Sequence, residues 1–253
     1  MLTDLPLASA LLAAASILVG SALQRLSGTG VGLVVTPVLS LLLGPVSGVL
    51  MTNATTTVSG FTIMLSVRDR VDWRKAGIVV ASALPGAVVG ALLVLVLPAA
   101  WLQLGIGLLV LLALGLTVAV PQLPHVTSRA ALPTAGAIGG LLNTTAGVAA
   151  PAMVIVSRLT RWEQRAFAAS LQPIFMSMGL MSVVLKSAMG ATGGQGLPPW
   201  WALPVVIALV LGGVRAGSAL ESRVPSERAR TLALLIAGLG GAAAVVKGVL
   251  GLL

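Results

Sequence analysis

The sequence predicts an all-α polytopic membrane protein built from two inverted-topology repeats, residues 1–125 and 126–253, and three observations lead to this prediction. First, 57% of the 253 residues are hydrophobic and only 8% are charged, with a mean hydropathy of +1.08. A soluble domain of this composition would expose a large apolar surface. Second, a run of small and hydroxyl residues interrupts an apolar segment once in each half. Third, matching loops of the two halves carry opposite charge bias.

The first half contains five apolar segments separated by polar, Pro or Gly residues. We expect them at about 5–26, 31–43, 46–67, 76–97 and 101–120. The first segment is preceded by Asp4, where a signal peptide would carry Lys or Arg. Removing this segment would also delete one member of the repeated pattern, so we expect it to be a retained helix.

The second half repeats this order, with segments at about 130–142, 146–157, 165–187, 200–220 and 230–252. The pieces 31–43 and 146–157 would span roughly 18 to 20 Å as helices. This is less than the ~30 Å thickness of the hydrocarbon core, so at least one end of each piece lies inside the membrane. We therefore expect about eight full transmembrane helices plus two short helices that either cross or are re-entrant.

The charges in the loops indicate that the two halves are inverted. The loop after the third segment is basic in the first half (68–75) and uncharged in the second (190–199). The loop after the short segment is uncharged at Gly44 and Pro45 but carries Arg158, Arg161 and Arg165 in the second half. By the positive-inside rule the basic loops are cytoplasmic and both termini lie outside, in the cell inner (plasma) membrane.

The two interruptions read GTGVGLVVTP at 28–37 and NTTAGVAAP at 143–151. Non-helical backbone survives inside a membrane only where protein or a water-filled cavity satisfies it. We therefore predict a substrate-binding site between the halves. Its candidate residues are Ser27, Gly28, Thr29, Gly30, Asn143, Thr144 and Thr145 in the breaks, with Asn53, Thr56, Ser170 and Gln172 on the third segment of each half.

Hydrogen bonding between helices is the alternative role for these polar residues. It is the better account of any single Ser or Thr. For Asn53 and Gln172, on matching segments, we favour a role in lining the site, because an unpaired amide in hydrocarbon is costly.

The residue types exclude several kinds of chemistry. The chain has no Cys, its one His (His125) sits in a loop, and its six Asp and Glu residues fall in loops or at segment ends. We therefore expect no metal site, no cofactor and no enzymatic base or nucleophile. Two helix N-termini inside the membrane would favour a small anion. An inside-negative potential drives such an anion outward by about 2.3 kcal/mol per charge per 100 mV.

Several stretches resemble the sulfite exporter TauE/SafE permeases. The Gly-rich runs that end in Pro, 28–37 and 147–151, are similar to the paired element of that family. Residues 69–93 resemble its V-D-W-R loop with the following helix, and 201–232 resemble the matching element of its second half. The resemblance implies transport of sulfur-containing anions such as sulfite, sulfoacetate or other organosulfonates.

These observations predict a secondary carrier or facilitator that exports a small anion, sulfite or an organosulfonate. An anion channel is a close alternative, because sequence does not separate the two. A non-transporting membrane assembly subunit is a further alternative, and it would have apolar packing at the breaks and no polar cavity. The expected partners are the anion and the lipid bilayer. Nucleic acid is not expected, because the basic residues that give the net charge of +9 lie in short loops.

Overall fold

The computed structural model describes residues 6–28, 30–119, 128–193 and 201–253. Within these ranges every regular element is a helix, which confirms the all-α class. The first half forms α1 (Leu7–Ser27), α2 (Gly30–Leu43), α3 (Pro45–Val67), the 3-10 turn η1 (Arg68–Arg70), α4 (Trp73–Val96) and α5 (Ala99–Ala119). The second half forms α6 (Ala131–Ala146), α7 (Ala150–Leu159), α8 (Gln164–Ala188), α9 (Ala202–Leu220) and α10 (Ser226–Leu250). Thr29 and His125 lie outside the described residues.

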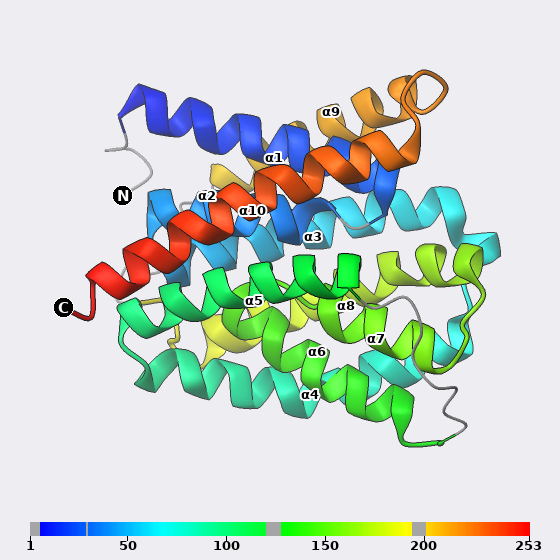
Figure 1. The fold of residues 1–253 in the computed structure, drawn as a ribbon, viewed down its shortest axis with the longest axis horizontal. Coiled ribbons are helices and arrows are strands. Elements are labelled where there is room, and N and C mark those ends of the chain that lie inside the picture. The colour runs from blue at the N-terminus through cyan, green and yellow to red at the C-terminus, as the bar shows by residue number, and fades with distance from the viewer. Residues whose placement is uncertain (1–5, 29, 120–127, 194–200) are drawn as a thin grey trace.

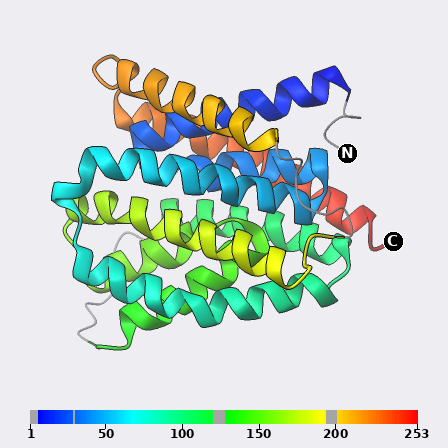
Figure 2. The ribbon, with the colours of Figure 1, turned by 180° about the vertical axis from the view of Figure 1, so that it is seen from behind.

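The helices form a bundle with α3 and α8 packed against each other in its middle. Figure 2 shows this pair between α9 on one side and α4 on the other. Helix α4 packs against α6, and α9 packs against α1. Helices α5 and α10 pack against each other and cover the face that is nearer the viewer in Figure 1.

The basic turns gather at one end of the bundle, which we call the basic end. The turns between α3 and α4, between α7 and α8, and between α9 and α10 lie there, on the right in Figure 1. The turns after α2 and after α4, and the end of α10, lie at the other end, which we call the opposite end. Arg70 and Arg161, from loops of different halves, therefore belong to the same end.

The two short helices are returning arms of helical hairpins. Helix α2 has 14 residues and runs back to the opposite end, where α1 begins (Figure 1). Helix α7 has 10 residues and runs back to the basic end, where α6 begins. At 1.5 Å per residue these helices are about 21 and 15 Å long, too short to span the bilayer core.

Among the described residues, six helices are long and apolar enough to cross a membrane: α1, α4, α5, α8, α9 and α10. Helix α3 has 23 residues but carries a row of Thr, Ser and Asn side chains that lowers its hydropathy. Helix α6 has only 16 residues. Length and apolar composition thus support six of the roughly eight full crossings that the sequence predicts.

The second interruption does not begin where the sequence analysis placed it. We expected the preceding helix to end at 142, but α6 continues to Ala146. The reason is that the threonine hydroxyls are compatible with the helix: Thr145 Oγ1 donates to the carbonyl of Leu141 at 2.8 Å. Only at Gly147, with φ of 68°, does the backbone leave the helix. Asn143, Thr144 and Thr145 therefore form the last turn of α6.

Small residues hold α6 tightly against α4. A Cβ atom on Gly86 would meet the carbonyl of Ala137, and a Cβ atom on Gly140 would meet the carbonyl of Ala83. Such close backbone approach is the usual source of helix association in a bilayer, where burial of apolar surface gives little. This packing fixes the position at which α6 ends.

Candidate functional site

Two helices end inside the bundle by the same local geometry. Helix α1 ends at Gly28 with φ of 83°, and α6 ends at Gly147 with φ of 68°. The N–H of Gly28 donates to the carbonyl of Gln24 at 2.8 Å, and that of Gly147 donates to the carbonyl of Asn143 at 2.9 Å. Both glycines adopt the left-handed conformation that favours glycine at a helix C-terminus. We call the interruption at Gly28 break 1 and residues 147–149 break 2.

Break 2 lies directly against helix α2. A Cβ atom on Gly32 would come within 2.6 Å of the Gly147 carbonyl oxygen. Thr36 Oγ1 donates to the same oxygen at 3.4 Å. The first turn of α2 and the chain that leads into α7 are therefore in contact at the middle of the bundle.

A small cavity of about 20 Å³ lies at this contact, and we call it the central cavity. The first turn of α2 lines it with Val31 and Gly32, and the start of α7 lines it with Ala149 and Ala150. The first N–H groups of a helix have no partner within the helix and carry the positive end of its dipole. The central cavity has room for about one water molecule, so it is a constriction rather than an open path.

Three polar side chains complete the lining of the central cavity: Gln24, Thr56 and Asn143. Thr56 Oγ1 donates to the carbonyl of Thr52 at 2.8 Å, so its oxygen remains able to accept. Gln24 and Asn143 are almost fully buried, with 1% and 3% of their surfaces exposed. Each forms a bridge to an amide on one of the two central helices.

The first bridge joins Asn143 of α6 to Asn53 of α3. Asn143 Nδ2 donates to Asn53 Oδ1 at 3.1 Å. Asn53 Nδ2 donates to the Asn143 carbonyl at 3.2 Å and to Ser182 Oγ at 2.7 Å. Asn53 therefore holds the last turn of α6 against both α3 and α8.

The second bridge joins Gln24 of α1 to Gln172 of α8. Gln24 Nε2 donates to Gln172 Oε1 at 2.9 Å, and Ser59 Oγ donates to Gln24 Oε1 at 2.8 Å. Gln172 Nε2 donates to the carbonyl of Gly28 in break 1 at 3.4 Å. Gln172 thus contacts break 1 itself, whereas Asn53 contacts the last turn of α6, just before break 2.

The structure separates the other candidate residues into different surroundings. Ser27 and Gly28 line a larger cavity described below, and Gly30 begins α2. Thr144 is buried against Gly90 of α4, where a Cβ atom would lie 2.9 Å from Thr144 Cβ. Thr145 Oγ1 donates within its own helix.

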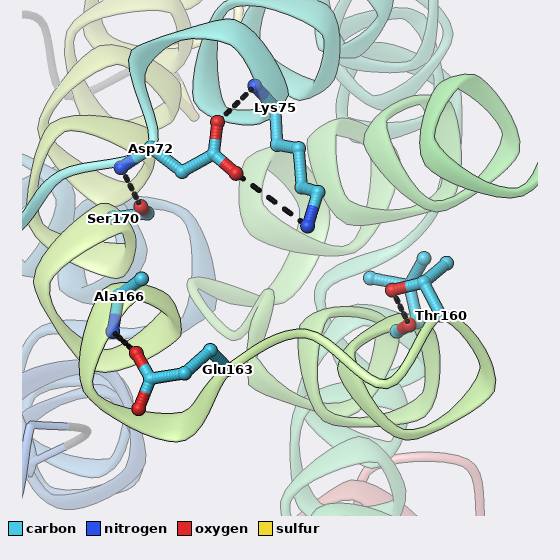
Figure 3. Close-up of polar contacts among 7 residues, drawn as sticks. Asp72, Lys75, Thr160, Glu163, Ala166 and Ser170 are labelled. Atoms are coloured by element: carbon cyan, nitrogen blue, oxygen red, sulfur yellow. Dashed lines mark hydrogen bonds and ion pairs between the residues drawn. The ribbon is translucent and has the colours of Figure 1, made fainter.

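Ser170 lies away from the amide bridges, near the basic end. Its hydroxyl accepts the N–H of Asp72 at 2.9 Å (Figure 3). Asp72 caps α4 by accepting the N–H of Lys75 at 3.0 Å. Ser170 therefore fixes the turn between α3 and α4 rather than contributing to the central cavity.

A cavity of about 510 Å³ adjoins the central cavity on the side of the basic end, and we call it the arginine cavity. The two share Leu33 and Ala150 in their linings. The arginine cavity is lined by Ser27, Gly28, Leu33, Ala113, Ala150, Pro151, Val154, Ser157, Arg158, Arg161, Trp162, Gln164, Phe167, Ala168, Leu171, Arg230 and Leu234. It contains three guanidinium groups and no carboxylate among these residues, so it favours anions.

Among the described carboxylates, Asp72 and Glu163 cap helices, and none lines the arginine cavity or the central cavity. At the start of α8, Glu163 accepts the N–H of Arg165 at 2.9 Å and that of Ala166 at 2.6 Å; Figure 3 shows the contact with Ala166. These hydrogen bonds lower the pKa of Glu163 below its ordinary value of 4.5. No group of three or more His, Cys, Asp or Glu side chains occurs among the described residues, so this part of the chain offers no metal site.

Sequence analysis missed Gln24, although a signal for it exists. Gln24 stands four residues before Gly28, as Asn143 stands four residues before Gly147. Aligning the two interruptions on Gly28 and Gly147 places Gln24 and Asn143 at the same position. The arginine cavity was also missed, because Arg158, Arg161 and Arg230 were assigned to the charge bias of the loops alone.

Comparison with known families agrees with this geometry. A family model described as Sulfite exporter TauE/SafE matches residues 12–245, nearly the whole chain. The chain belongs to this family. Comparisons with curated proteins and with solved structures found no match.

Membership of the TauE/SafE family makes the chain a multi-pass membrane protein that transports sulfur anions, and it is not an enzyme. The family resemblance drawn from the Gly-rich runs and the V-D-W-R loop is thereby confirmed.

Proposed function

We propose that this TauE/SafE family member exports a small sulfur anion, sulfite or an organosulfonate, across the cell inner (plasma) membrane as a secondary carrier or facilitator. In this proposal residues 1–125 and 126–253 are inverted repeats, the basic end is cytoplasmic and both termini are outside. The anion binds where the breaks meet the two amide bridges.

The observation that carries the proposal is the correspondence between the bridges. Asn53 and Gln172 each occupy the ninth position of their helices, α3 and α8. Their partners Asn143 and Gln24 each stand four residues before the left-handed glycine of a break. Asn53 therefore corresponds to Gln172, and Asn143 to Gln24, when the first half is aligned with the second. In the same alignment α4 corresponds to α9 and α6 to α1, and α4 packs on α6 as α9 packs on α1. This correspondence supports inverted repeats.

The chemistry of the path suits an oxyanion. The arginine cavity concentrates anions at the basic end. The N-termini of α2 and α7, with the side-chain amides of Gln24 and Asn143, then offer uncharged hydrogen-bond donors at the central cavity. Donors without a fixed positive charge bind an anion while still allowing it to leave, as transport requires.

The size of the central cavity favours a carrier over an open channel. With about 20 Å³ it is closed to sulfite, whereas the arginine cavity beside it holds about 510 Å³. An anion of the size of sulfite does not fit through this constriction, so passage requires a rearrangement of the helices. An assembly subunit would have apolar packing at the breaks, and the buried amide bridges argue against it.

Export is favoured by the electrical potential. With the basic end in the cytoplasm, an anion enters the arginine cavity from the side that is negative. The potential then drives each charge outward by about 2.3 kcal/mol per 100 mV. No intramembrane proton relay is required for this direction.

Transport by purified protein in proteoliposomes tests the proposal. We expect sulfite or an organosulfonate to exchange across the bilayer under an imposed potential, and a panel of sulfite, thiosulfate, sulfate, sulfoacetate and taurine identifies the preferred anion. Protein-free liposomes give the background flux. If no member of the panel moves above that background, the proposed function is wrong.

The variants Asn53→Ala and Gln172→Ala test the site. Each removes one carboxamide bridge, and losing a buried hydrogen bond of about 1–3 kcal/mol should lower anion affinity or flux about tenfold. Thr62→Ala on α3 and Ser187→Ala on α8 are matched controls, because these hydroxyls donate only to carbonyls of their own helices in the contacts described. Unchanged transport in both amide variants would remove Asn53 and Gln172 from the site.

A further inference from the structure

Lys186 is a basic side chain buried inside the bundle. It lies in the last turns of α8, and its side chain has 0% of its surface exposed. Its Nζ atom makes no hydrogen bond to any described part of the chain. A buried, unpaired ammonium is very unfavourable in a membrane protein unless it serves a ligand.

The position of Lys186 places it beyond the amide bridges, toward the opposite end. Ser182, one helical turn earlier, accepts the hydrogen bond from Asn53 Nδ2 at 2.7 Å. Residues four apart share a face of a helix, so Lys186 follows Ser182 on the face that packs on α3. Lys186 is thus about 6 Å further along the axis of α8 than Ser182.

Lys186 does not line the cavity at the opposite end, but its backbone contacts a residue that does. The Lys186 carbonyl accepts the N–H of Ala191 at 2.8 Å. Ala191 lines a cavity of about 480 Å³, which we call the glycine-lined cavity because Gly44, Gly190 and Gly193 also line it. The starts of α3 and α5 and the ends of α2 and α4 contribute to the same lining, so helix ends of both polarities face it.

No side chain described here supplies Lys186 with a counter-charge. The five described carboxylates lie in turns or helix starts at the basic end, and the residues lining the glycine-lined cavity are all uncharged. The described carboxylates are Asp69, Asp72, Glu163, Glu221 and Glu227. Lys186 therefore has no counter-charge among the described side chains on this side of the amide bridges, and an anion that reaches this region would supply one.

We propose that Lys186 is a second anion-binding group, which receives the transported anion after it leaves the amide bridges. This inference rests on the proposed function and deepens it. The path then has three parts: the arginine cavity, the uncharged donors of the central cavity, and Lys186 below the glycine-lined cavity. The anion supplies the counter-charge that Lys186 lacks. Lys186 therefore stabilises the anion in the part of the path beyond the amide bridges.

Replacement of Lys186 by an apolar residue of similar length tests the inference. In proteoliposomes we expect Lys186→Met to lower the rate of sulfite transport, or of the preferred anion of the panel, at least tenfold. The melting temperature of Lys186→Met in detergent should equal or exceed that of the wild type, because the substitution removes an unpaired buried charge. Lys247→Met is the matched control: Lys247 is exposed at the same end and donates to the carbonyl of Leu41.

The outcomes separate this inference from the proposed function. Absence of anion transport by the wild type would overturn the proposed function, and the Lys186 inference with it. A transporting wild type with an equally active Lys186→Met variant would overturn the Lys186 inference alone. Equal losses in Lys186→Met and Lys247→Met, or a lower melting temperature of Lys186→Met, would also overturn it.

Discussion

Gly32 and Gly147 set how closely the two halves approach at the centre of the bundle. The added Cβ at Gly32 would lie 2.6 Å from the carbonyl oxygen of Gly147, and this oxygen also accepts from Thr36. The Gly147 carbonyl oxygen and the Cα atom of Gly32 both belong to the backbone. Neither can move away from the other without shifting the start of α2 or the chain that leads into α7. The contact is therefore a residue-level determinant of the geometry of the central cavity.

Gly32→Ala should disturb this contact. We expect a loss of stability of about 1–3 kcal/mol from overpacking, together with lower anion transport because break 2 is displaced. Gly105→Ala on α5 is the matched control, since a Cβ there meets nothing within 4 Å. The control should be neutral or stabilising by roughly 0.5–1 kcal/mol. Thermal unfolding in detergent measures both, and equal stability of Gly32→Ala and the wild type would contradict the close contact.

At the scale of elements, the ends of the helices decide where the site forms. Break 1 and break 2 use left-handed glycines, whereas α4 and α8 begin with acidic side chains that accept backbone N–H groups. The N-terminal cap of α8 is Glu163, which precedes Gln164 and Phe167 in the wall of the arginine cavity. Loss of this cap would loosen that wall.

The cap predicts a pH dependence. The pKa of Glu163 is lowered in the folded protein, so its contribution to stability is fully present above its ordinary pKa of 4.5. It is lost as the pH falls through the lowered value. Below about pH 4.5 the melting temperature of the wild type should therefore fall more steeply than that of Glu163→Gln. Parallel curves for the two proteins would show that the cap does not act through its charge.

Much of the element pattern could be predicted from the sequence. Apolar length and Pro or Gly punctuation gave segments 46–67 and 165–187 close to α3 and α8. The second break was expected at 143–145, but α6 continues to Ala146. The Thr145 hydroxyl donates to a carbonyl of its own helix, which composition alone does not show. The positions of Asn53 and Gln172 beside the breaks were predicted, whereas their partner Gln24 was not.

Other parts of the site depend on packing between distant segments. The arginine cavity combines residues from α7 and α10, and no local pattern relates Arg161 to Arg230. The burial of Lys186 likewise depends on its neighbours, since the sequence shows only a basic residue near the end of a segment. Ser170 was expected in the central site, and only the turn before α4 reveals its partner, Asp72.

At the scale of the whole molecule, the account requires two halves of opposite orientation that meet in the bilayer. Arg70 follows α3, the third helix of the first half, and Arg161 follows α7, the second helix of the second half. In the inverted arrangement both turns face the same compartment. Lys247, near the end of α10, faces the other compartment. All three side chains are exposed, so each position is accessible to a reagent.

Sided labelling of single cysteines tests this arrangement most directly. The chain contains no Cys, so Arg70→Cys, Arg161→Cys and Lys247→Cys can each be labelled without background. With a membrane-impermeant maleimide, we expect the first two to react only in inverted vesicles and Lys247→Cys to react only in spheroplasts. Reaction of Arg70→Cys and Arg161→Cys from opposite compartments would contradict the inverted halves and the anion path between them.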